Sequence, residues 1–280
     1  FRALLAVWPV LLVFGMVVGG IYLGWFTPTE GAAVGAFGTG LIAWFNGGLN
    51  RASMAESFYV TARSTAMIFF IVLGAAFYNG FLALTQVPQE IANWVVAQGY
   101  SPVVVLVLIF IFYLLLGCLM DSLSMILLTI PIFWPVMQQL DFGFVSMAEL
   151  HAVRAAEALR EGIVLAPDIL QNIQDTLAAG AELTRDQVRS LEIRGVSKGA
   201  LDRLNTEQVA IWFGILVLIV VEVGLITPPV GMNLFIINAM DRETPMVETY
   251  KAVMFFVVSD IIRVVFLVAF PFITLMLIPW

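Results

Sequence analysis

The sequence predicts an all-α integral membrane protein that carries a small soluble insert. Of its 280 residues, 61% are apolar and only 12% are charged, whereas about a quarter of the residues in a soluble domain are charged. Several apolar runs reach the roughly 20 residues that a helix needs to cross a bilayer. Residues 138–208 hold 7 of the 13 Lys and Arg and 11 of the 20 Asp and Glu. We therefore expect membrane segments at 1–142 and 209–280, separated by a polar insert at 143–208.

Composition excludes several classes of function. The net charge of −7 leaves no basic surface for phosphates, so nucleic acid is not an expected partner. A single Cys (Cys118) and a single His (His151) exclude a disulfide framework and a zinc cluster. Because no nucleophile and base pair stands out, we expect neither an enzyme nor a bound cofactor.

The expected membrane segments follow the apolar runs, which cover residues 3–26, 31–49, 64–87, 102–120, 123–137, 209–240 and 252–280. Pro28 is suited to open the second helix, and Glu30 to cap it. The chain opens at Phe1 without a starting Met, and its first run has no small-residue cleavage site. We therefore expect a fragment of a longer protein, not a signal peptide.

The distribution of Lys and Arg predicts how the chain crosses the membrane. Loops 50–63 and 241–251 each carry two cations, whereas loop 88–101 carries none. Short cytoplasmic loops are enriched in Lys and Arg, so residues 102–137 must leave and return on the same side. This favours a helical hairpin with Asp121 and Ser122 at its tip. The insert is then expected on the outer, periplasmic side.

Two interrupted segments are the candidate functional elements: residues 117–124 and 222–233. Backbone that is not helical is tolerated at membrane depth only when it is buried in protein or lines a wet cavity. Pro228 and Pro229 remove two consecutive amide donors, so carbonyls around Gly224 lose their helical partners. A single proline kink is a common structural feature, but two breaks rich in Gly, Pro, hydroxyl and amide groups favour a binding site.

The chemistry of these breaks suits a small cation and an anionic substrate. Free carbonyls together with Ser, Thr and Asn oxygens suit Na⁺, and helix N-termini suit a carboxylate. The candidate binding residues are Gly117, Asp121, Ser122, Ser124, Gly224, Thr227, Pro228, Gly231 and Asn233, with Glu222 in support and Na⁺ expected at Ser122, Gly224 and Thr227. Asp121 either lies near the cation or caps a helix, and Glu222 either pairs with a cation or binds backbone amides. A proton is the alternative coupling ion.

Other polar and aromatic residues are interpreted as structural. Asp260 and Arg263 are spaced to pair on one helix face. We expect Trp212 to anchor a segment end at the membrane interface. His151 is expected to be a solvated helix residue.

The insert is expected to form short soluble helices. Ser146 with Glu149, and Thr184 with Gln187, have the spacing of capping boxes. Pro167 is suited to start another helix. The insert is either a tolerated surface insertion or a docking module for a binding protein or a neighbouring subunit.

Three stretches resemble one transporter family: residues 19–34, residues 117–135 with the sequence Gly-Cys-Leu-Met-Asp-Ser, and residues 222–235 with Thr-Pro-Pro-Val-Gly. They are similar to the C-terminal half of the large membrane (M) subunit of TRAP transporters, over about 1–142 and 209–280. The resemblance implies a sodium-driven secondary transporter of organic anions, such as dicarboxylates or sialic acid, in the bacterial inner membrane. It also implies an ion-transporter-superfamily-like fold of two inverted repeats, with 102–137 as the hairpin and 209–240 as the broken helix.

The resemblance also implies partners, namely a small Q-type membrane subunit and a periplasmic binding protein. The first repeat is absent from this sequence, so a further chain carrying it is expected. The family also joins the hairpin to the broken helix by a shorter linker than the 65 or so residues between Phe142 and Ile211. These two departures leave an alternative open, a structural or scaffold subunit of a larger membrane complex, derived from half of a TRAP transporter.

Overall fold

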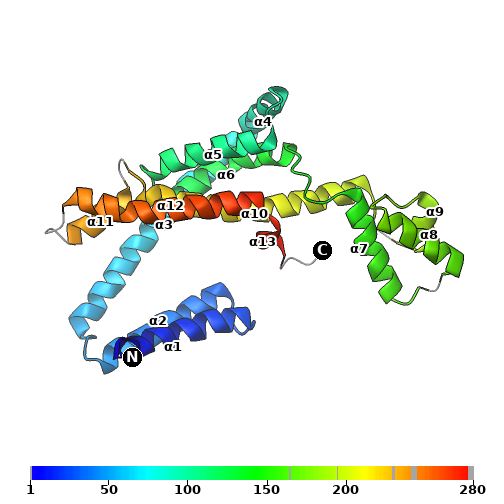
Figure 1. The fold of residues 1–280 in the computed structure, drawn as a ribbon. Helices are drawn as coiled ribbons and strands as arrows, with labels where there is room; N and C mark the ends of the chain where they lie inside the picture. Colours follow the sequence, from blue (N-terminus) through cyan, green and yellow to red (C-terminus); the bar gives the residue numbers. More distant parts are fainter. Residues whose placement is uncertain (1, 164, 194, 229–230, 241–244, 277–280) are drawn as a thin grey trace. The chain divides into compact units, whose positions relative to one another are not determined.

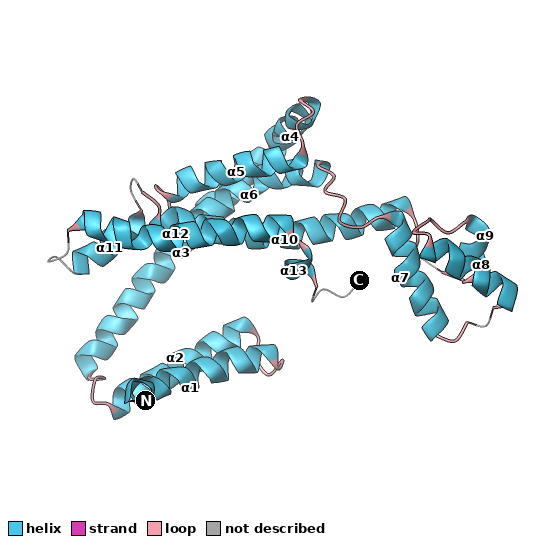
Figure 2. Cartoon of the chain, in the orientation of Figure 1, coloured by secondary structure: helices cyan, strands magenta, loops and turns pink. Residues whose placement is uncertain are grey.

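The computed structural model describes residues 2–163, 165–193, 195–228, 231–240 and 245–276. The regular structure of this described part is helical throughout, which confirms the all-α prediction (Figure 2). Within these described ranges, four helices are long and apolar enough to cross a membrane: α3 (Arg51–Thr85), α6 (Ser122–Gln139), α10 (Lys198–Ile226) and α12 (Met246–Ala269). The chain divides into two compact units, residues 1–71 and 72–280, and α3 runs from the first into the second.

The first unit contains α1 (Arg2–Tyr22) and α2 (Pro28–Phe45), joined by a tight turn. The Glu30 carboxylate accepts a hydrogen bond from the Thr27 amide at 2.8 Å, and the Thr27 hydroxyl accepts one from the Glu30 amide at 3.3 Å. This reciprocal capping box satisfies two amides that the start of α2 would otherwise leave free. The predicted capping role of Glu30 is confirmed.

Small residues let α1 and α2 pack closely. A Cβ placed on Gly31 would lie 3.0 Å from Ile21 Cδ1, and one on Gly35 would lie 3.3 Å from Val17 Cγ2. Because α2 presents glycine at these positions, the aliphatic side chains of α1 rest directly on its backbone. This is the usual way in which membrane helices gain close contact without a hydrophobic driving force between them.

The second unit is built around a helical hairpin and α10. The hairpin arms are α5 (Pro102–Gly117) and α6, and α4 (Val87–Ala97) packs against α6 (Figure 1). The Thr129 and Tyr113 hydroxyls are hydrogen-bonded at 2.7 Å, and the Tyr113 ring meets the Phe133 ring edge-on. These contacts pair residues on either side of the turn at 118–121, as antiparallel arms require. The two arms form the hairpin that the charge pattern predicts at 102–137.

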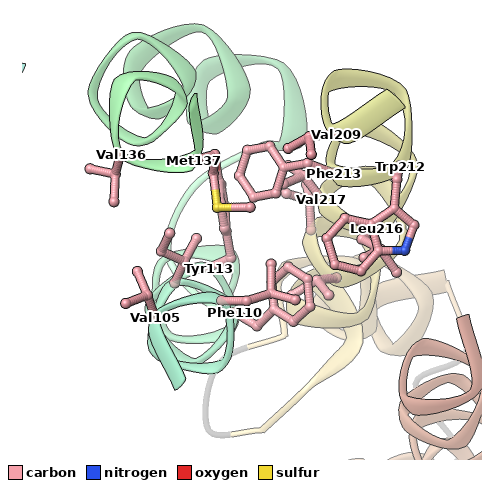
Figure 3. Packing of buried hydrophobic residues seen from close by; sticks show 14 of the residues in the cluster. Val105, Phe110, Tyr113, Val136, Met137, Val209, Trp212, Phe213, Leu216 and Val217 are labelled. Atoms are coloured by element: carbon pink, nitrogen blue, oxygen red, sulfur yellow. The ribbon is translucent and has the colours of Figure 1, made fainter. Parts of the chain in front are cut away.

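One face of α10 supplies more of the core of this unit than any other helix does. Phe213 and Val217 point toward the hairpin (Figure 3), and these two side chains and that of Leu216 are each at most 1% exposed. Trp212 is also buried, and its indole nitrogen donates to the Leu267 carbonyl of α12 at 3.0 Å. The predicted interfacial role of Trp212 is therefore wrong, because the ring fixes α10 against α12 within the core.

Three further helices of this unit contact α10. These are α11 (Met232–Met240), α12 and the short α13 (Phe272–Leu275). Within α12, Arg263 and Asp260 form an ion pair of 2.9 Å. This confirms the predicted pairing on one helix face.

The insert folds as α7 (Met147–Arg160), α8 (Pro167–Ala178) and α9 (Arg185–Ser190), followed by the start of α10. Both predicted capping boxes are present, at Ser146 and Thr184. Ala155, Ile173, Leu183 and Leu191 form a small buried core. The expected boundary at 208/209 falls inside α10, so one continuous helix links the insert to the membrane segment.

His151 is part of the insert's interior, and the expectation of a solvated residue is wrong. Its side chain is only 6% exposed, and its Nδ1 accepts a hydrogen bond from the Leu183 amide at 2.9 Å. Helical periodicity does not predict this contact, because the loop that covers His151 comes more than 30 residues later. The imidazole thus ties α7 to the segment before α9.

Acid is expected to destabilise the insert through His151. Burial lowers the pKa of His151 below its usual 6.5, while the charge of Glu182 opposes this in part. Below pH 6.5 the unfolded state therefore binds more protons than the folded state, and stability falls as the pH drops toward the lowered pKa. The slope cannot exceed about 1.4 kcal/mol per pH unit for one group.

Hydrogen exchange of the Leu183 amide, corrected for its intrinsic rate, measures this effect in the full chain. The opening free energy should be constant above about pH 7.5 and should decline between pH 6.5 and 5.5. His151→Asn retains an acceptor near the Nδ1 position but does not titrate, so it should remove the decline. An identical pH profile in both proteins would contradict the assignment.

Candidate ion and substrate site

Asp121 begins the second arm of the hairpin. It is the N-cap of α6, where its Oδ2 accepts a hydrogen bond from the Ser124 amide at 2.9 Å. The Ser124 hydroxyl donates to the other carboxylate oxygen. The capping role, one of the two interpretations left open by the sequence, is therefore present. It fixes the direction in which α6 leaves the tip and keeps a carboxylate there.

Two glycines bring the hairpin tip against the break in α10. A Cβ built on Gly117 would lie 2.7 Å from Gly224 Cα, and one built on Gly224 would lie 2.8 Å from Gly117 Cα. Real Cβ atoms do not approach backbone this closely, so the two helices touch only because both residues are glycine. The two predicted breaks, far apart in the sequence, thus meet at one point.

Cys118 belongs to this junction, although the sequence analysis did not include it among the candidate residues. The thiol is buried, and its Sγ lies 3.3 Å from the Leu114 carbonyl oxygen, 3.4 Å from that of Thr227 and 3.8 Å from that of Pro228. A thiol is a weak donor, so it satisfies these oxygens only in part. The sequence signal that could have identified Cys118 is its position between Gly117 and Asp121 at the hairpin tip.

The helix α10 ends at the junction, where several of its last carbonyl groups accept hydrogen bonds from outside the helical pattern. Thr227 is its C-cap, with the amide donating to the Gly224 carbonyl at 3.1 Å and the hydroxyl donating to Val223. Gly117 ends α5 at the same place. Because the C-terminus of a helix carries a partial negative charge, two negative helix ends converge at this junction.

The other side of the break leads into α11. Gly231 has a φ of 56°, a conformation that glycine adopts without strain, and a Cβ there would lie 3.3 Å from the Thr227 carbonyl oxygen. Asn233 is half-buried in the first turn of α11, and Ser122 is half-buried in the first turn of α6. Among the described residues, neither side chain has a hydrogen bond to α10. Pro229, singled out from the sequence, lies outside the described residues.

Glu222 does not join this junction. Gly224 is buried against α5, whereas Glu222 is exposed on a different face of α10. Two residues along a helix correspond to a rotation of about 200°, which separates the two side chains. The structure therefore brings Gly117, Gly224, Thr227 and Pro228 together but leaves the supporting carboxylate outside.

A helical hairpin whose tip meets a broken membrane helix is an arrangement typical of secondary transporters. The fold and site thus define a multi-pass membrane protein of the transporter class. Residues 1–273 match the family model of the tripartite ATP-independent periplasmic transporter, DctM component. The chain belongs to this family, the large permeases of TRAP transporters, as the sequence motifs predict.

Several curated relatives are similar to the chain over part of their length. The C4-dicarboxylate TRAP transporter large permease protein DctM of Pseudomonas aeruginosa is 27% identical over 276 residues, which is 98% of this chain and 49% of that protein. The corresponding DctM of Rhodobacter capsulatus is 26% identical over 85% of this chain and 39% of its own. The sialic acid TRAP transporter large permease protein SiaM of Vibrio cholerae is 33% identical over 49% of this chain and 32% of its own. The chain thus spans about half the length, or less, of these relatives. No solved structure matches the chain.

Proposed function

We propose that this chain is a membrane subunit of a Na⁺-coupled TRAP-type transporter that takes up organic anions of the dicarboxylate class across the bacterial inner membrane. Family membership supports the transporter class. The observation that carries the ion-coupling proposal is the meeting of two helix C-termini at Gly117 and Gly224. The dicarboxylate class follows the names of the relatives that cover most of the chain.

In this proposal, Na⁺ binds on the carbonyl side of the junction. The ligands are the Gly224 and Thr227 oxygens together with the Ser122 hydroxyl. A cation there neutralises the two converging helix ends and draws the hairpin tip toward α10. The substrate carboxylate binds on the opposite side, at the amides that begin α11 and at the Asn233 amide group. The start of α6 is less suitable, because Asp121 already accepts from one of its amides.

The chain requires partners to perform this function. We propose a small Q-type membrane subunit, a periplasmic binding protein and the elements of the first repeat, on a separate chain or on the same polypeptide. The insert at 143–208 then lies on the periplasmic side. Gentle purification from native membranes, followed by mass spectrometry, tests this composition directly. Copurification with an unrelated membrane complex alone would instead support the scaffold alternative.

Thr227 provides the sharpest test of ion coupling. In the purified assembly reconstituted into liposomes, an inward Na⁺ gradient should drive uptake of labelled succinate, and an equal K⁺ gradient should not. Thr227→Ala removes the hydroxyl and should raise the Na⁺ concentration for half-maximal uptake about tenfold, which corresponds to about 1.4 kcal/mol. Thr227→Ser keeps a hydroxyl and should stay close to the unmodified protein. Uptake that does not depend on the Na⁺ gradient in any of the three proteins would contradict Na⁺ coupling.

A further inference from the structure

A polar side chain of α10 is buried without a partner. Gln208 is only 6% exposed, and within the described part of the chain its amide group makes no hydrogen bond. A buried amide that loses water without gaining a partner destabilises the fold, so such groups are rare and need an explanation. Gln208 lines a cavity of about 320 Å³. A partner for its amide therefore has to come from this cavity.

The other walls of the cavity are mainly apolar. Phe144, Phe270 and Phe272 supply three rings, and those of Phe270 and Phe272 meet edge-on with their centroids 6.2 Å apart. The volume is about ten times the roughly 30 Å³ that one water molecule occupies, and apolar walls offer few hydrogen bonds to a cluster of water. An occupant with an apolar body and one hydrogen-bonding group fits these walls better.

The charge of the cavity selects the kind of hydrogen-bonding group. Ala269, the last residue of the 24-residue helix α12, lines the cavity, and a helix C-terminus carries a partial negative charge. No charged side chain is among the described lining residues, so nothing there holds an anion. The faces of phenyl rings attract organic cations, whereas metal ions prefer a shell of oxygen ligands. Charge complementarity therefore favours an organic ammonium group, which also donates to the Gln208 amide oxygen.

The depth of the cavity indicates where this ammonium group comes from. Gln208 directly precedes the apolar run 209–221 of α10, and α12 ends at Ala269 beside it. The second arm of the hairpin, α6, ends at Gln139, shortly before Phe144. Three apolar segments thus end near the cavity, which places it where the hydrocarbon core gives way to lipid headgroups. Phospholipids of the ethanolamine type carry an ammonium group at this depth.

We propose that this cavity binds the ammonium headgroup of a phospholipid of the ethanolamine type. The Gln208 amide oxygen accepts a hydrogen bond from the ammonium group, and the rings of Phe144 and Phe272 surround it. The lipid phosphate stays outside the cavity, at the membrane surface. The bound lipid holds the end of α12 against the start of the apolar part of α10. The proposal rests on the burial, lining and charge of the cavity, and it holds whether or not the proposed Na⁺ coupling is correct.

Lipid retention, measured by native mass spectrometry, tests the proposal. The purified full chain is placed in nanodiscs with equal amounts of phosphatidylethanolamine and phosphatidylglycerol that carry the same acyl chains, and is then released into detergent. The unmodified protein should retain phosphatidylethanolamine about tenfold over phosphatidylglycerol, because only the former offers an ammonium group to the amide and the rings. Equal retention of the two lipids would overturn the proposal. Stabilisation of that protein by free ethanolamine would then assign the cavity to a soluble amine.

Two variants locate the retained lipid. Gln208→Met keeps the length of the side chain without its amide and should reduce the enrichment about tenfold, the loss expected for a hydrogen bond to a charged group. Phe272→Leu should reduce it about threefold, as expected for one cation–π contact. Gln174→Met in α8 and Phe255→Leu in α12 change exposed residues outside the cavity and should keep the full enrichment. Full enrichment in Gln208→Met would reject the cavity as the lipid site.

The stability of the lipid-free protein separates this role of Gln208 from a structural one. In detergent without phosphatidylethanolamine, Gln208→Met should leave Tm unchanged or raise it, because it replaces an unpaired buried amide with an apolar group of similar shape. The lost enrichment is then not a result of misfolding. A lower Tm would show that the Gln208 amide already has a partner within the protein, and this would also overturn the proposal.

Discussion

Gly224→Ala is expected to separate the hairpin tip from α10. The new Cβ would lie 2.8 Å from Gly117 Cα, and because both contacting groups are backbone, no side chain can rotate away. Forcing extra atoms into a packed interior costs about 1–3 kcal/mol and more when the backbone must move. The gain in helix propensity from Gly to Ala, about 1 kcal/mol, offsets only part of this. Because only backbone can move apart here, we expect a cost of about 3–4 kcal/mol, hence a net loss of about 2–3 kcal/mol and of the junction itself.

Thermal unfolding of the purified protein measures the effect. A loss of this size should lower Tm by roughly 4–12 °C for a unit of about 200 residues. Gly214→Ala is the matched control, since Gly214 lies in the same helix and a Cβ there would meet no atom within 4 Å. It should leave Tm unchanged or raise it slightly. Equal stability of the two variants would show that α5 and α10 do not touch at Gly117 and Gly224.

Two variants of Asp121 should distinguish its role as the N-cap of α6 from a role of its negative charge in ion binding. Asp121→Asn keeps an oxygen that can accept from the Ser124 amide, because Asn and Asp are equally good N-caps. Its Tm should therefore remain within about 2 °C of the unmodified protein. Asp121→Ala removes the cap and should cost about 1 kcal/mol. If the carboxylate also attracts the proposed cation, the Asn variant should lose at least tenfold in Na⁺-driven succinate uptake while it remains folded.

The measurement is uptake as a function of Na⁺ concentration in the reconstituted assembly, with Tm recorded on the same samples. Asp121→Asn should require more Na⁺ for half-maximal uptake, because a neutral cap no longer balances the cation in a medium of low dielectric. Uptake equal to that of the unmodified protein would show that Asp121 serves only as the cap of α6. Loss of both Tm and uptake in the Asn variant would show that the cap itself needs the charge.

Local signals determined much of the architecture. Thr27 with Glu30, Ser146 with Glu149, and Thr184 with Gln187 predicted three helix starts, because a capping box is complete within four residues. The hairpin followed from the distribution of Lys and Arg between loops, which depends on the membrane and not on tertiary packing. The three family motifs likewise identified the transporter class before the fold was known.

Only the tertiary structure decided which faces meet. Segments such as α5 and α10 are apolar on nearly every side, so periodicity does not reveal a buried face. The contact between Gly117 and Gly224, the thiol of Cys118 beside the Thr227 carbonyl and the burial of Trp212 all depend on how two such helices cross. The same crossing turns Glu222 away from the junction. The sequence by itself therefore determined where helices begin, break and turn, while packing between uniformly apolar surfaces decided which residues form the site.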